Sequence, residues 1–164
     1  MNIISTFNSI RDISYKIPLK FGEEDNCCSG KSERLFNLLT KMGYTVRYRV
    51  CTFSWSSMNL PLELMNIAHE DSSTHSFLEI EIGGVWKVLD PTWDKGLKDV
   101  FHVNVWDGES DTEIAVKPIK IFTPKKSLEI MNDQSEKVIN KDLEMNKKFY
   151  EAFNLWLEKK RNKS

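Results

Sequence analysis

The chain has 164 residues and a formal net charge of −1, and its 40% hydrophobic and 29% charged residues are typical of one folded domain. Its 23 basic and 24 acidic side chains give no overall basic character, so we expect no nucleic-acid partner. Three cysteines, two of them adjacent, do not make a disulfide framework, which predicts a reducing, cytoplasmic location. We find neither a signal-peptide core nor an apolar run long enough for a bilayer, so no membrane partner is expected.

The first part of the chain predicts two helices. Residues 3–14 place apolar side chains near helical spacing, and the segment ends before Pro18. A second helix is expected after a polar connection, capped by Asp25 or Asn26, whose side-chain oxygens can accept from its free N–H groups. Gly43 marks its end. The predicted apolar face of this helix consists of Leu35, Leu38, Leu39 and Met42.

The rest of the chain predicts an antiparallel sheet followed by a helix. The expected strands are 44–55, 77–82, 85–89, 101–106 and 113–116. Gly83-Gly84 between the second and third of them is a strong hairpin signal. An amphipathic helix is expected from Lys141 onwards. Helices followed by antiparallel strands predict an α+β fold.

The connection 56–74 is too long for a simple link between two strands. Pro61 is suited to start a short helix within it. The segment runs directly into His75 and contains several apolar side chains. Two interpretations remain open, a flap over a cleft and a small satellite core.

Three residues have the side chains that a thiol nucleophile requires: Cys28, His75 and Asp90. Such a nucleophile needs a lowered pKa, a base within hydrogen-bond reach and a group that orients the base. Cys28 falls in the first turn of the predicted second helix, where the helix dipole favours a thiolate. A two-residue turn at Gly83-Gly84 makes His75 and Asp90 diagonal neighbours on one face, with Cα atoms about 7–8 Å apart. Each residue taken alone also fits an ordinary structural role. Cys28 could be a buried core cysteine, His75 a surface or capping histidine, and Asp90 a turn residue.

Two blocks of sequence resemble the transglutaminase-like superfamily. The block from Cys28 to Arg47 has the family's cysteine, an apolar helix and a glycine, Gly43, 15 residues after the cysteine. The block from His75 to Thr92 resembles the family's histidine strand, hairpin, tryptophan and Asp-Pro-Thr ending. Upstream, Arg11-Asp-Ile-Ser-Tyr15 is similar to the helix end and tyrosine that often precede the cysteine. The resemblance covers roughly residues 5–95, in the order Cys, His, Asp.

The resemblance implies a papain-like core, with the nucleophile helix packed on an antiparallel sheet. We expect one domain over 1–164, with a catalytic core at about 5–95 and a sheet extension and closing helix in 96–164. By this resemblance Cys28 is the nucleophile, His75 the general base and acid, and Asp90 the orienting carboxylate. The implied reaction is acyl transfer from peptide or protein amides through a thioester. We expect hydrolysis, by a peptidase or amidase. The alternatives are a true transglutaminase and a catalytically idle peptide-binding domain. The resemblance implies no metal or organic cofactor.

The sequence departs from the family pattern at two positions, and at one of them Phe77 stands two residues after the histidine in place of the usual tryptophan. Asn26 stands where the family often has glycine, two residues before the cysteine; asparagine tolerates left-handed backbone better than most residues. The Cys28 backbone N–H is the expected oxyanion donor. A register shifted by one residue would make Cys27 the nucleophile, but the spacing to Gly43 favours Cys28. A zinc site using both cysteines is disfavoured because adjacent cysteines lack the C-x-x-C spacing.

Overall fold

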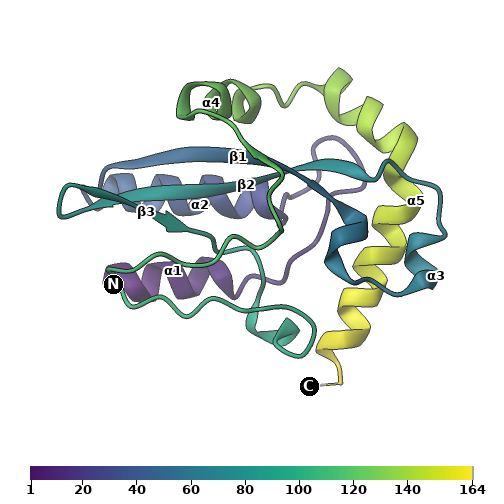
Figure 1. Cartoon of the computed structure of the whole chain (residues 1–164), viewed down its shortest axis with the longest axis horizontal. Helices are drawn as coiled ribbons and strands as arrows, with labels where there is room; N and C mark the ends of the chain where they lie inside the picture. Colours follow the sequence, from purple (N-terminus) through teal and green to yellow (C-terminus); the bar gives the residue numbers. More distant parts are fainter. Residues whose placement is uncertain (164) are drawn as a thin grey trace.

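The computed structural model describes residues 1–163 as an α+β fold, with helices around a four-stranded antiparallel sheet (Figure 1). The strands, in sheet order, are β3 (Val85–Leu89), β2 (Ser72–Ile82), β1 (Val46–Ser54) and β4 (Lys120–Ile121). The helices are α1 (Ile3–Arg11), α2 (Cys28–Lys41), α3 (Leu62–Met65), α4 (Pro124–Asn132) and α5 (Glu136–Arg161), with 3₁₀ turns η1 (Trp55–Met58) and η2 (Lys95–Leu97). No helix in the described part is long and apolar enough to cross a membrane.

The hairpin between β2 and β3 has the register that the sequence predicts. Gly83 and Gly84 have φ angles of 58° and 80°, the left-handed backbone that a two-residue hairpin turn requires. Ile82 therefore pairs with Val85, and the ladder continues from there to the end of β3. β2 begins well before the predicted 77–82, because its first half pairs with β1.

Helices α1 and α2 pack against each other on one face of the sheet (Figure 1). The prediction for the buried face of α2 is half correct. Leu35 and Leu39 are fully buried, but Leu38 is 38% exposed. The rest of the buried face is polar, because Lys31 and Ser32 have no exposed surface. The predicted end of α2 is confirmed, since Gly43 follows it with a φ of 91°.

The predicted strands at 101–106 and 113–116 are wrong. The segment forms no strand: the Glu113 backbone bonds to the buried Asn104 side chain, and the Thr112 N–H donates to the Val88 carbonyl at the end of β3. Helix α4 was not predicted; it packs along β1, where the Ser127 hydroxyl accepts from the Val50 N–H at 2.9 Å. Helix α5 is the predicted C-terminal helix, and it begins earlier than Lys141 because Ser135 caps it.

Two apolar cores lie on opposite faces of the sheet. The core under α1 and α2 comprises Phe7, Ile10, Leu35, Leu39, Leu78, Ile80, Leu89 and Trp106. The other is rich in aromatic residues and joins β1 and β2 to α5; it comprises Tyr15, Cys51, Phe53, Trp55, Leu64, Phe77, Trp93, Leu97, Val116, Phe149, Tyr150, Phe153 and Leu157. The connection 56–74 packs into this second core through Met58, Leu60, Leu64, Met65 and Ile67, so it is not a separate satellite core.

Candidate active site

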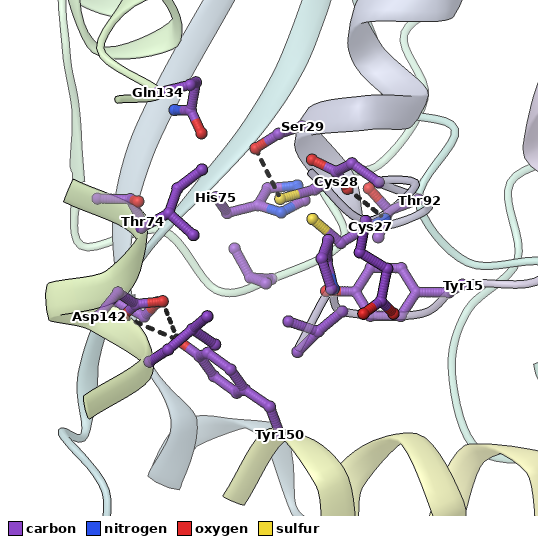
Figure 2. A pocket seen from close by; sticks show the side chains of 18 of the residues that line it. Tyr15, Cys27, Cys28, Ser29, Thr74, His75, Thr92, Gln134, Asp142 and Tyr150 are labelled. Carbon is purple, nitrogen blue, oxygen red and sulfur yellow. Dashed lines mark hydrogen bonds between the residues drawn. The ribbon is translucent and has the colours of Figure 1, made fainter. Parts of the chain in front are cut away.

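The structure brings the three predicted residues together (Figure 2). Cys28 is the first residue of α2, His75 lies in the first half of β2, and Asp90 directly follows β3. The Nε2 atom of His75 lies 2.7 Å from Oδ2 of Asp90, and both side chains are buried. Cys28 is half-buried as a residue, and its sulfur lies beside the His75 ring. Because Nε2 is bonded to Asp90, Nδ1 is the ring nitrogen available to the thiol.

The start of α2 differs from the predicted cap. The N-cap residue is Cys27, and no side chain caps the helix. Asp25 instead accepts a hydrogen bond from the Cys27 N–H at 2.8 Å, and Asn26 accepts from Arg34 at 2.6 Å. Asn26 does not have the left-handed backbone that its place in the family pattern suggests, since the described non-glycine residue with positive φ is Asn59. Among residues 1–163 the Cys28 N–H has no hydrogen-bond partner, which leaves it free for a ligand.

The electrostatics favour a thiolate on Cys28. The neighbouring Cys27 thiol lowers the pKa of Cys28 most; burial opposes this, and His75 lowers the pKa further. Burial disfavours the charged form of His75, but Asp90 and Cys28 outweigh it and raise the pKa of His75 to about 10. The pKa of Cys27 shifts the other way, well above its usual value, chiefly because of its interaction with Cys28 and its burial. This arrangement can supply a sulfur nucleophile and a protonated imidazole together.

A set of hydrogen bonds that the sequence did not predict holds Asp90. Its Oδ1 accepts from the Thr92 N–H at 3.0 Å, and its Oδ2 accepts from the Ala115 N–H at 2.8 Å in addition to His75. The Asp90 N–H donates to Thr112 at 2.9 Å, and the Asp90 carbonyl accepts from the Asn104 amide at 2.9 Å. The 101–116 segment therefore fixes the carboxylate instead of extending the sheet.

Lys31 is a second unpredicted part of the site's framework. It lies one turn after Cys28 on α2 and has no exposed surface. Its ammonium donates to the carbonyls of Arg11, Ile13 and Thr92 at 2.7–2.8 Å. Burial lowers the pKa of Lys31 to about 7, although nearby carboxylates favour its charged form. These bonds join α2, the end of α1 and the segment after β3. The only sequence signal for this structural role was the position of Lys31 on the same face of the predicted helix as its apolar residues.

A cavity of about 400 Å³ opens beside Cys28 and His75 (Figure 2). Its apolar lining includes Phe53, Trp55, Met58, Val138, Ile139 and Leu143. Asp142 and Tyr150 contribute from α5, and the Tyr150 hydroxyl donates to the Asp142 carboxylate at 3.0 Å. Met58 belongs to the 56–74 connection and lines the cavity. The same residue packs against the aromatic core, so this part of the connection forms a wall of the cavity. The cavity is large enough to receive a side chain and the adjoining backbone of a peptide.

No family model, curated protein or solved structure matches the chain. Within residues 1–163, no group of three or more His, Cys, Asp or Glu side chains is arranged to hold a metal ion.

Proposed function

We propose that the chain is a transglutaminase-like cysteine enzyme with a papain-like site, which hydrolyses peptide or protein amides through a thioester. The observation that carries the proposal is one cluster: a sulfur at a helix N-terminus, an imidazole beside it, and a buried carboxylate 2.7 Å from that imidazole. These are the three components that an activated thiol requires. A reducing, cytoplasmic setting would keep the Cys28 sulfur available.

In the proposed reaction the Cys28 thiolate attacks the amide carbon, and a carbon–sulfur bond forms while the carbonyl electron pair moves to oxygen. The Cys28 N–H can donate to that oxyanion. When the carbonyl re-forms, the carbon–nitrogen bond breaks, and the His75 imidazolium gives its proton to the leaving amine. The neutral imidazole then takes a proton from water, which attacks the thioester and releases the acid. Asp90 keeps the ring in one orientation and favours its protonated form.

The proposal is tested by incubating the wild type, Cys28→Ala and His75→Ala with a peptide library in ¹⁸O-labelled water containing a dansylated alkylamine. Mass spectrometry then identifies new carboxyl termini. We expect ¹⁸O in new termini with the wild type and none above background with either variant. Amine-tagged products that depend on Cys28 would indicate a transglutaminase instead of a hydrolase. Peptide binding with no Cys28-dependent product would indicate an idle binding domain and contradict the enzyme proposal.

A further inference from the structure

Helix α5 forms one wall of the cavity, and this wall carries apolar side chains together with one carboxylate. The α5 wall consists of Val138, Ile139, Asp142 and Leu143. Figure 2 shows Asp142 apart from the Cys28 sulfur, on a different wall of the cavity. Helix α5 lies outside the part of the chain that resembles the transglutaminase-like superfamily, so the resemblance implies nothing about what this wall binds.

Neutral donors hold the Asp142 carboxylate in one orientation. The Tyr150 hydroxyl lies 3.0 Å from both carboxylate oxygens, and the Asn146 amide donates to Oδ1 at 2.9 Å. Tyr150 and Asn146 are themselves buried, so they have little freedom to turn away. Burial raises the pKa of Tyr150 well above its usual value, and Asp142 raises it further, so the phenol keeps its proton and remains a donor.

Asp142 has no counter-ion within residues 1–163. None of the ion pairs in this part of the chain includes it. A second carboxylate, Glu70, accepts from the same Asn146 amide at 3.2 Å and also lacks an ion pair, so two negative groups lie around one neutral donor. Asp142 is exposed, which lets a ligand reach it, and a carboxylate oxygen can accept more than one hydrogen bond.

The other carboxylates of the lining differ from Asp142, because each has a partner nearby. Glu23 pairs with Lys16 at 3.9 Å, and Asp25 accepts from the Cys27 N–H at 2.8 Å. The thiolate and imidazolium of the catalytic pair offset each other's charge. The α5 wall is therefore the part of the lining where a negative charge faces the cavity without compensation.

We propose that the α5 wall is a subsite for a positively charged side chain, so that the preferred substrates are peptides with lysine or arginine near the amide that is cleaved. This inference rests on the proposed amide hydrolysis. The ammonium or guanidinium donates to Asp142, while the aliphatic stem of the same side chain packs on Val138 and Leu143. Because the carboxylate is already oriented, little freedom is lost on binding. An acidic side chain in this place would be repelled by Asp142 and Glu70.

The test compares the wild type, Asp142→Asn, Asp142→Lys and Glu144→Gln. The peptide library in ¹⁸O-labelled water shows which residues flank each Cys28-dependent cleavage. The best substrate is then synthesised with lysine, norleucine or glutamate at the enriched position, because norleucine has a similar stem without the ammonium. Glu144→Gln is the matched control, since it removes the same charge from an exposed residue of α5 outside the cavity lining. Iodoacetamide alkylation of Cys28 reports whether the nucleophile is intact in each variant.

We expect the wild type to cleave the lysine peptide with a kcat/KM about 10-fold above that of the norleucine peptide. Asp142→Asn should cleave these two peptides equally well, Asp142→Lys should prefer the glutamate peptide, and Glu144→Gln should match the wild type. Alkylation of Cys28 should be the same in all four proteins, because iodoacetamide is too small to need the α5 wall.

Two results would overturn the subsite and leave the proposed hydrolysis standing. One is cleavage by the wild type without preference for lysine or arginine, and the other is a preference that persists in Asp142→Asn. Equal losses with the lysine and norleucine peptides in Asp142→Asn would also overturn it, because they would place the effect on folding or on the reaction itself. A wild type that gives no Cys28-dependent product would overturn both proposals.

Discussion

The Nε2 atom of His75 lies 2.7 Å from Oδ2 of Asp90, because the Gly83-Gly84 turn brings two strands of one hairpin into antiparallel register. The two residues are 15 positions apart along the chain. The hairpin register thus brings the two side chains to the same face, and the 101–116 segment then holds the Asp90 carboxylate in place. Cys28, in contrast, reaches the pair only when α2 packs on the sheet.

Asp90→Asn tests whether the carboxylate sets the charge of His75. Loss of the negative charge removes the main influence that raises the pKa of His75, so less imidazolium faces the Cys28 sulfur. We expect alkylation of Cys28 to require higher pH and to be at least ~10-fold slower at about pH 6. Asp142→Asn, which changes another carboxylate of the cavity, should leave the pH midpoint unchanged. Equal shifts in both variants would show that net charge, and not the bond to His75, is responsible.

Asn104→Ala tests whether the Asn104 side chain, whose role the sequence did not predict, stabilises the backbone around Asp90. The buried Asn104 amide donates to the carbonyls of Asp90 and Glu113 and accepts from the Glu113 N–H. Removing it leaves buried backbone groups unsatisfied, so the free energy of unfolding should fall by about 2 kcal/mol. Chemical denaturation measures this fall. Asn37→Ala, at an exposed position of α2, is the control and should change stability by less than ~0.5 kcal/mol. If the two variants lost similar amounts of unfolding free energy, the hydrogen bonds of Asn104 would not be the cause.

Lys31→Met tests the buried ammonium as a structural link. Methionine retains most of the side chain's volume but leaves the carbonyls of Arg11, Ile13 and Thr92 without their donor. We expect a loss of about 3 kcal/mol in the free energy of unfolding, measured by denaturation at pH about 6, where Lys31 is charged. Lys41→Met, in the exposed last turn of the same helix, should be nearly neutral. If Lys31→Met had the same free energy of unfolding as the wild type, the three carbonyls would have found other hydrogen-bond donors.

Gly30→Ala tests the close approach that shapes the start of α2. A Cβ atom at this position would overlap the backbone carbonyl of Asp25, so the 25–27 segment would have to move. We expect a loss of stability of about 2 kcal/mol and slower alkylation of Cys28, because the residues before the cysteine would shift. Glu33→Ala, on the exposed side of α2, should retain both properties. Unchanged alkylation in Gly30→Ala would mean that the position of Cys28 does not depend on this contact.

The sequence was informative wherever the structure is set by neighbours along the chain. The two-residue glycine turn determines the pairing of β2 and β3, so the sequence alone predicts that His75 and Asp90 are close neighbours on one face. The helix that carries Cys28 has a regular pattern and a glycine at its end. Its cap could not be derived, because Asp25 bonds to the backbone of Cys27, outside the helix.

The sequence failed where distant segments decide the structure. In 101–106 the apolar alternation suggested a strand, yet Val105 is 88% exposed while Asn104 and Trp106 are buried. Asn104 is buried because its side chain bonds to the carbonyl of Asp90, just after β3. The alternation of apolar residues in 101–106 cannot predict a hydrogen bond to another segment. The burial of Lys31 has the same origin, since its acceptors come from two other segments.

The central claim, that Cys28 is an activated nucleophile paired with His75, is tested most directly by the pH dependence of iodoacetamide alkylation, followed by mass spectrometry of each cysteine. The lowered pKa of Cys28 makes its thiolate present at low pH, whereas the raised pKa of Cys27 keeps that thiol protonated. We therefore predict selective labelling of Cys28 at about pH 6, with Cys27 as the internal control.

In His75→Ala the midpoint for Cys28 should move toward the usual thiol pKa near 9. Labelling of Cys28 only above about pH 8, at the same rate in the wild type and His75→Ala, would contradict the account.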